Sequence, residues 1–299
     1  MENMISIILF ISILILLFIY FINFIQHKIN KNHVQNKWQK KILSILPILI
    51  IVFIIRSFIY ESFRIPSSSM VPNLLIGDFI LVKKFAYGIR DPIFHTNIIK
   101  TSLPNRGDVI VFRHPIQTNI NYIKRVIGIP GDTIIYNIIN KKIVIIPMCN
   151  SSISCKIIHV VQKTLPYNNN YINNTYKEEY NNFYAYNQIK KHIFKHFFSL
   201  KLLEEKIENK KYKIILLQNL FNVHHTNKKN INYNKIWIVP KKKYFVMGDN
   251  RDNSFDSRYW GYVPEKNLVG QATYIWMSIK NIKYWFPITF RLFRIGTIN

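Results

Sequence analysis

Three consecutive serines, Ser67, Ser68 and Ser69, stand between two prolines in the stretch "IPSSSMVP" (65–72). Serines bounded by prolines are typical of an ordinary loop. One of these hydroxyls could instead be a nucleophile, but a serine hydroxyl is weak at neutral pH and needs a base beside it. Which interpretation holds depends on whether the chain supplies that base.

Histidine is the first base to consider, as in a Ser-His-Asp triad. Of nine histidines, only His95 and His114 lie in the well-patterned part of the chain, and neither stands in a stretch that indicates a site. His114 directly precedes a proline, which is more typical of a turn or a strand edge. Histidine is therefore the weaker candidate.

Lysine is the other candidate base, and Lys124 stands in "YIKRVIGIPGD", a predicted strand rich in Ile and Val. A lysine at its reference pKa of about 10.4 is protonated, but burial lowers that pKa and yields a neutral amine that can accept a serine proton. The two-residue period of a strand places Lys124 on the face opposite Ile123 and Arg125. A lone lysine in a strand is also typical of a solvated edge, so this signal alone stays open.

A third polar cluster is "GDNRDNSFDSRYWGYVPE" (248–265), in an otherwise apolar chain. It is either a solvated loop with Asx turns or a buried network whose polar groups all need hydrogen-bond partners. Asp256 and Arg258 could form an ion pair that orders it.

Short β-branched and aromatic runs separated by turn residues predict a mostly β domain rather than alternating βαβ units. Strands are expected within 78–88, 107–115, 121–132, 236–250 and 267–279, and a hairpin within 132–147 that turns near Asn140 and Lys141.

The segment 156–235 is different, because it contains the low-complexity stretch "YNNNYINNTYKEEYNN", which favours a loop. Within it, residues 188–211 space apolar side chains at helical intervals, and both an amphipathic helix and a diverged β segment remain open.

Two apolar runs precede the β domain. Positions 3–27 contain no Asp, Glu, Lys or Arg and exceed the length needed to cross a bilayer. Glu2, the long apolar core and the lack of a small-x-small site argue against a cleaved signal peptide. We expect spans over 1–25 and 42–61, and a basic loop over 26–41 that lies in the cytoplasm by the positive-inside rule. The first residues and the domain after 61 would then lie outside it.

Lys and Arg number 41 against 15 Asp and Glu, a formal charge of +26. Such a charge is typical of nucleic-acid or anionic-membrane binding, but the general excess of Ile, Asn, Lys and Tyr indicates a compositional bias instead. The two cysteines, Cys149 and Cys155, could form a short-range disulfide in an oxidising compartment or remain free thiols. Two cysteines do not complete a zinc site by themselves.

Together, three stretches closely resemble the motif boxes of bacterial type I signal peptidases: "RSFIYESFRIPSSSMVPNLLIGDFILVKKFAYGIRDP", "YIKRVIGIPGD" and "GDNRDNSFDSRYWGYVPE". The resemblance covers roughly 42–155 and 236–299. It implies an antiparallel β fold of the signal-peptidase and LexA type behind two transmembrane helices. The catalytic β domain would comprise 62–132 and 240–299, and 133–239 would form a second β subdomain with a divergent insertion.

The resemblance also implies residue roles. Ser69 matches the nucleophile and Lys124, which follows it by 55 residues, matches the general base. Ser67 matches the serine whose hydroxyl joins the Ser69 N–H in the oxyanion hole. The residues that orient the base or support it would be Ser254, Gly248, Asp249, Asp256 and Arg258. Those that line the substrate pockets would be Phe63, Ile65, Pro66, Met70, Leu74, Tyr122 and Ile123.

The implied function is that of a membrane-bound serine endopeptidase that removes N-terminal signal peptides without a metal or cofactor. Its partners would be signal peptides of preproteins, the lipid bilayer and, as a candidate, the secretion translocon, with no nucleic acid. It would be a multi-pass protein of the bacterial inner membrane with a periplasmic catalytic domain. The alternatives are a membrane-tethered basic nucleic-acid-binding protein and an inactive relative. A soluble self-cleaving Ser/Lys repressor conflicts with the apolar residues 1–60.

Overall fold

The computed structural model describes residues 2–29, 41, 44–91, 97–148, 157–165, 198–219, 233–280 and 289–298. The predicted cysteine pair, Cys149 and Cys155, and most of the basic loop lie outside these ranges, as does His95. The chain divides into two compact units. One comprises Met1–Ser62 and Val82–Leu103, and the other comprises Phe63–Leu81 and Pro104–Asn299.

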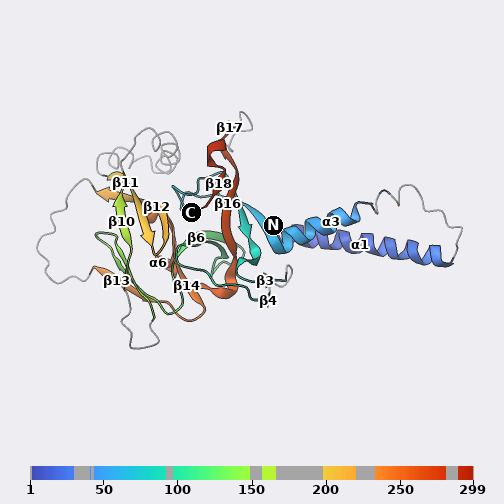
Figure 1. Ribbon diagram of the computed structural model, residues 1–299, viewed down its shortest axis with the longest axis horizontal. Coiled ribbons are helices and arrows are strands. Elements are labelled where there is room, and N and C mark those ends of the chain that lie inside the picture. Colours follow the sequence, from blue (N-terminus) through green and yellow to red (C-terminus); the bar gives the residue numbers. More distant parts are fainter. Residues whose placement is uncertain are drawn as a thin grey trace, which may run out of the picture. The chain divides into compact units, whose positions relative to one another are not determined.

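The first unit contains two apolar helices, α1 (Glu2–Ile29) and α3 (Leu46–Ile54) (Figure 1). A π-helical turn, η1 (Ile55–Ile59), continues α3. The rings of Phe10 and Phe53 lie 5.9 Å apart between centroids, so the two helices pack side by side. The unit also contains η2 (Lys84–Ala86) and the strand pair β3 (Ile89–Arg90) and β4 (Asn97–Ile99).

Of the helices in the described ranges, α1 alone is long and apolar enough to cross a bilayer, through Ile7–Gln26. Most of its side chains are exposed, as a lipid-facing helix requires. The apolar helical stretch Leu46–Ile59 covers much of the second predicted span but is shorter than a bilayer-crossing helix. One membrane-spanning helix is therefore supported by length and composition.

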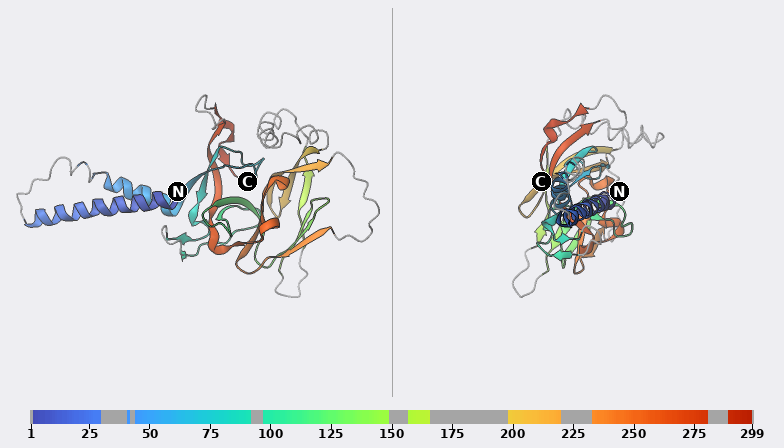
Figure 2. Two further views of the ribbon diagram at one scale, coloured as in Figure 1. Left: turned by 180° about the vertical axis from the view of Figure 1, so that it is seen from behind. Right: turned by 90° about the vertical axis from the view of Figure 1, so that its right-hand side faces the viewer.

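A curled sheet has the strand order β1-β2-β16-β5-β6-β14-β15, and its strands from β16 to β15 lie wholly in the second unit (Figures 1 and 2). The pairs β16–β5, β5–β6 and β6–β14 are antiparallel, and β17 and β18 pair with β16. The strands are β1 (Tyr60–Arg64), β2 (Asp78–Lys83), β5 (Val109–Arg113), β6 (Asn121–Gly128), β14 (Lys243–Met247), β15 (Val263–Pro264), β16 (Leu268–Lys280), β17 (Thr289–Phe290) and β18 (Gly296–Thr297). The short helices are η3 (Arg251–Asn253), α6 (Ser257–Trp260), η4 (Glu265–Asn267) and η5 (Leu292–Arg294).

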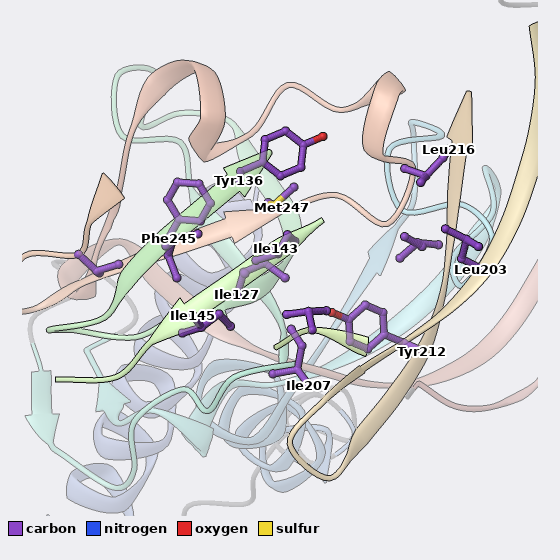
Figure 3. Packing of buried hydrophobic residues seen from close by; sticks show 14 residues of the cluster. Ile127, Tyr136, Ile143, Ile145, Leu203, Ile207, Tyr212, Leu216, Phe245 and Met247 are labelled. Atoms are coloured by element: carbon purple, nitrogen blue, oxygen red, sulfur yellow. The ribbon is translucent and has the colours of Figure 1, made fainter. Parts of the chain in front are cut away.

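Two smaller sheets belong to the same unit, with orders β13-β7-β8-β9 and β10-β11-β12. Their strands are β7 (Thr133–Asn137), β8 (Ile143–Ile146), β9 (Ile158–His159), β10 (Val161–Thr164), β11 (Phe198–Ile207), β12 (Lys210–Asn219) and β13 (Asn234–Ile238). Figure 3 shows Ile143 and Ile145 of β8, Ile207 and Tyr212 of the β11–β12 hairpin, and Phe245 of β14 in one buried cluster. This core therefore joins both small sheets to a strand of the large one.

The predicted hairpin within 132–147 is confirmed as β7 and β8, and Lys141 after its turn has a φ of 57°. For the stretch 188–211, the β alternative holds wherever the structure describes it, because β11 occupies Phe198–Ile207. Leu203 and Ile207 are buried, while Lys206 between them is exposed. The apolar spacing of this stretch fits a helix as well as a strand, and the packing of Leu203 and Ile207 in one cluster with β8 residues selects the strand.

Candidate active site

Ser69 and Lys124 meet in the second unit. The Lys124 Nζ lies 2.7 Å from the Ser69 Oγ and donates a second hydrogen bond of 2.9 Å to the Ile123 carbonyl. Lys124 stands in β6 opposite Ile110 of β5, and its side chain is 3% exposed. Ser69 lies in the segment that follows β1 and is also buried. The 55-residue separation is thus bridged by the sheet rather than by local chain geometry.

Burial lowers the pKa of the Lys124 ammonium from 10.5 to about 8, although the negative charges of Asp256 and Asp249 act in the opposite direction. Removal of water disfavours the charged form of an amine. A useful fraction of Lys124 is therefore neutral near physiological pH and can accept a proton from Ser69.

An open pocket of about 540 Å³ adjoins this pair. Residues 66–69, 120–124 and 252–255, together with Tyr259, line it. The serine segment, the first half of β6 and the polar loop therefore converge on one open surface.

The serines beside Ser69 have different environments. The Ser67 Oγ lies 3.4 Å from the Ser69 Oγ and is placed in the pocket wall. The Ser68 Oγ accepts a hydrogen bond of 2.9 Å from the Asn253 Nδ2. Ser67 can therefore face a bound substrate, while Ser68 anchors the segment.

The predicted substrate residues fall into two groups. Pro66, Tyr122 and Ile123 are in the pocket wall. Met70 and Leu74 have no exposed surface, Ile65 is buried and Phe63 is half-buried; none of these four lines the pocket. In this structure Ile65, Met70 and Leu74 are therefore core residues rather than pocket residues.

Gly248 packs tightly against Ser69 and Ser254. A Cβ on Gly248 would lie 2.5 Å from the Ser69 carbonyl oxygen and 2.6 Å from the Ser254 Cβ, so only glycine fits. Ser254 lines the pocket with Lys124, but its buried Oγ has no hydrogen-bond partner among the described residues. The contact to the lysine that the resemblance implies is not formed here.

Asp249 and Asp256 of the polar loop are buried and paired with arginines. Asp256 accepts hydrogen bonds of 2.8 Å from both the Nε and a terminal nitrogen of Arg258, and one of 3.0 Å from the Gly248 N–H. Asp249 binds Arg125 through two bonds of 2.8 Å. Strand alternation therefore sends Lys124 to the serine and its neighbour Arg125 to the loop.

Sequence reasoning missed several residues that hold this site. The Asn250 N–H donates to the Ser69 carbonyl at 3.0 Å, and its Nδ2 donates to the Ser68 carbonyl at 3.2 Å. Asn253 binds Ser68, and Arg251 pairs with Glu205 from the distant strand β11. The many Asn and Asp residues in 248–253 could have indicated that Asn250 and Asn253 hold the site by hydrogen bonds. The sequence around Glu205 contains no such indication.

His114, the rejected base, lies beside Tyr122 and Trp260 with ring centroids at 4.7 and 5.4 Å. Its Nδ1 accepts a bond from the Gln117 N–H, and burial lowers the pKa of its imidazole. It makes no hydrogen bond to Ser69 within the described residues. In the same ranges, no group of three or more His, Cys, Asp or Glu side chains could hold a metal ion.

The chain is similar to known proteins along most of its length. A family model described as "Signal peptidase, peptidase S26" matches residues 38–277. Signal peptidase I of Buchnera aphidicola subsp. Acyrthosiphon pisum is 47% identical over 92% of this chain and 86% of its own. That of Buchnera aphidicola subsp. Schizaphis graminum is 47% identical over 90% of this chain and 85% of its own.

Among solved structures, a signal peptidase I from Enterococcus faecalis matches with a TM-score of 0.26 and 22% identity, over 58% of this chain and all of its own. The family model covers well over half of the present chain, and the Buchnera relatives extend the likeness along most of its length. Ser69 and Lys124 both lie within the matched residues, and the chain belongs to the signal peptidase family, peptidase S26.

Proposed function

We propose that Ser69 and Lys124 form the catalytic dyad with which this membrane-anchored signal peptidase removes N-terminal signal peptides from secreted preproteins. The observation that carries the assignment is the 2.7 Å contact between the Lys124 Nζ and the Ser69 Oγ. A lysine this buried, with a pKa of about 8, is a base rather than a surface charge. Membership of the S26 family supports the same reaction.

The reaction starts when the Ser69 Oγ attacks the scissile carbonyl while the Lys124 Nζ accepts its proton. The Ser69 N–H and the Ser67 hydroxyl hold the oxyanion, and such a donor contributes about 3–4 kcal/mol in other hydrolases. Lys124 then returns the proton to the leaving amine, which leaves an acyl-enzyme. A water molecule attacks this acyl-enzyme while Lys124 accepts a proton from the water. These steps need no metal or cofactor.

The substrate would bind as an extended segment beside residues 63–67 and 121–124, with main-chain hydrogen bonds giving affinity. Pro66, Tyr122 and Ile123 already form part of the pocket wall, so they are the best candidates to select small side chains one and three places before the cut. Phe63 and Ile65 would need to come into contact with substrate on binding.

We further assign the chain to the bacterial inner membrane as a two-span protein with its catalytic domain on the periplasmic side. Helix α1 supports the first span, and the stretch 42–61 would provide the second, with flanking polar residues reaching the interface. Anchoring at the lipid surface raises the effective concentration of membrane-embedded signal peptides. A secretion translocon is a further candidate partner.

Cleavage of a secretory precursor by the full-length chain in detergent micelles tests the dyad. The wild type is expected to cut once after a small residue, whereas Ser69→Ala and Lys124→Ala are inert with unchanged circular dichroism. Lys163→Ala, at an exposed lysine of β10, is the matched control and is expected to cut like wild type. Equal cleavage by wild type and Lys124→Ala would show that another group is the base.

A further inference from the structure

The position of the nucleophile depends on the loop that carries η3. Asn250 donates to the Ser69 and Ser68 carbonyls, and Asn253 donates to the Ser68 hydroxyl. These two asparagines flank Arg251. Any shift of the loop at Arg251 would therefore be passed to the serine segment through three hydrogen bonds.

The Arg251 side chain extends into the protein rather than into the pocket. Its guanidinium is 1% exposed and binds both carboxylate oxygens of Glu205, one at 2.6 Å. Although burial acts against the cation, Glu205 raises the pKa of the guanidinium, so the pair is ionic. Arg251 is thus tied to strand β11 by a planar, two-point contact that fixes direction as well as distance.

Glu205 is itself held in place. Its carboxylate has no exposed surface and accepts further bonds from the Tyr212 hydroxyl at 3.0 Å and the Gln162 Nε2 at 2.8 Å. Tyr212 lies directly across the β11–β12 hairpin from Glu205. With four donors on two oxygens, the carboxylate has little freedom to turn.

The same hairpin contacts the loop at further points. The Ile215 N–H donates to the Asp249 carbonyl at 3.0 Å, and the Leu217 N–H donates to the Asp252 carboxylate at 2.7 Å. The Tyr212 ring lies 3.9 Å from the guanidinium of Arg125, which binds Asp249. The loop is therefore attached to the hairpin on both sides of Arg251.

We propose that Glu205 is a positioning residue of the serine–lysine site, acting through Arg251 to hold the loop that orients Ser69. This inference rests on the proposed function. Buried ion pairs contribute little net stability, and apolar residues of similar volume can often replace them without loss. If the pair serves to fix one loop conformation, its replacement should separate activity from stability.

The test is the double variant Glu205→Met/Arg251→Met in the full-length chain, measured by thermal unfolding and by steady-state cleavage of a signal-peptide substrate. We expect a variant that still unfolds cooperatively above the assay temperature, although the buried Tyr212 hydroxyl loses its acceptor. We expect a KM within about twofold and a kcat lowered about tenfold or more, because a displacement near 1 Å can cost about 100-fold in rate. Wild-type kcat, or a raised KM with unchanged kcat, would overturn the proposal.

If the double variant does not fold, the isosteric Glu205→Gln decides. It keeps the shape but removes the charge, so kcat should fall at unchanged KM; wild-type kcat would overturn the proposal. Glu208→Gln is the matched control, because Glu208 is on the same hairpin, half-exposed and paired with Arg106 instead. It should cut like wild type. If wild type and Glu208→Gln both fail to cut, the proposed function fails rather than the role of Glu205.

Discussion

Cleavage by the wild-type chain is expected to rise with pH through an acid limb centred near pH 8. Burial sets this value by lowering the pKa of Lys124 to about 8. Only the neutral amine accepts the Ser69 proton, so kcat/KM follows the neutral fraction of Lys124 in the free enzyme. A pKa of about 8 makes that fraction about 1% at pH 6, about 10% at pH 7 and about half at pH 8.

The assay uses the full-length chain in micelles and a peptide with alanine one and three places before the scissile bond, at concentrations below KM. We expect kcat/KM to rise about tenfold from pH 6 to 7, about fivefold from pH 7 to 8 and less than about twofold from pH 8 to 9. His114→Gln should show the same limb, because burial lowers the pKa of His114 below its reference of 6.5.

Two results would refute this reasoning. A plateau already reached at pH 7 would indicate a base with a histidine-like pKa. A rise of about tenfold per pH unit continuing to pH 10 would indicate a lysine with its ordinary pKa, which contradicts a buried Lys124. In either case the contact with Ser69 would not describe the active enzyme.

Three further predictions follow from the packing of the site. Lys124→Met should raise the free energy of unfolding at pH 7 by up to about 3 kcal/mol, because the lysine binds a proton more tightly in the unfolded chain than when it is buried. This gain should disappear as the pH rises from about 8 to above 10.5. Thermal unfolding in micelles at pH 7 and pH 11 measures the difference. Gly248→Ala should lower kcat about 100-fold or more in the cleavage assay, since its new methyl group displaces the Ser69 carbonyl; wild-type activity would show that the backbone adjusts freely. Ser67→Ala should lower kcat about 100-fold with little change in KM, and an effect on KM alone would remove Ser67 from the oxyanion hole.

Strand period predicted which β6 side chains lie on opposite faces of the sheet. The alternation of β6 is enough to place Lys124 and Arg125 on opposite faces, and the structure uses one for Ser69 and the other for Asp249. Such information is local, so a sequence carries it directly. The glycines and other turn residues at the ends of the strands are likewise local signals that can be read from the sequence.

The supporting contacts were not predictable in this way. Glu205 lies in a stretch whose apolar spacing suited a helix or a strand, and its partner Arg251 follows 46 residues later. Only the packing of the hairpin decides that the two meet. Met70 and Leu74 show the converse case, because resemblance placed them at the substrate while the structure buries both completely. Which side chains of this segment face the pocket is decided by how the segment packs in the folded protein, and residue type alone does not predict it.

The partners of the serine segment come late in the chain. Lys124 follows Ser69 by 55 residues, while Asn250 and Asn253 follow Ser68 by 182 and 185 residues. A nascent polypeptide that has emerged only as far as β6 carries Ser69 and Lys124 but lacks the loop that binds the serine segment. The segment is therefore held by residues translated long after it, and a product terminated before residue 248 would lack all three of these hydrogen bonds to Ser68 and Ser69.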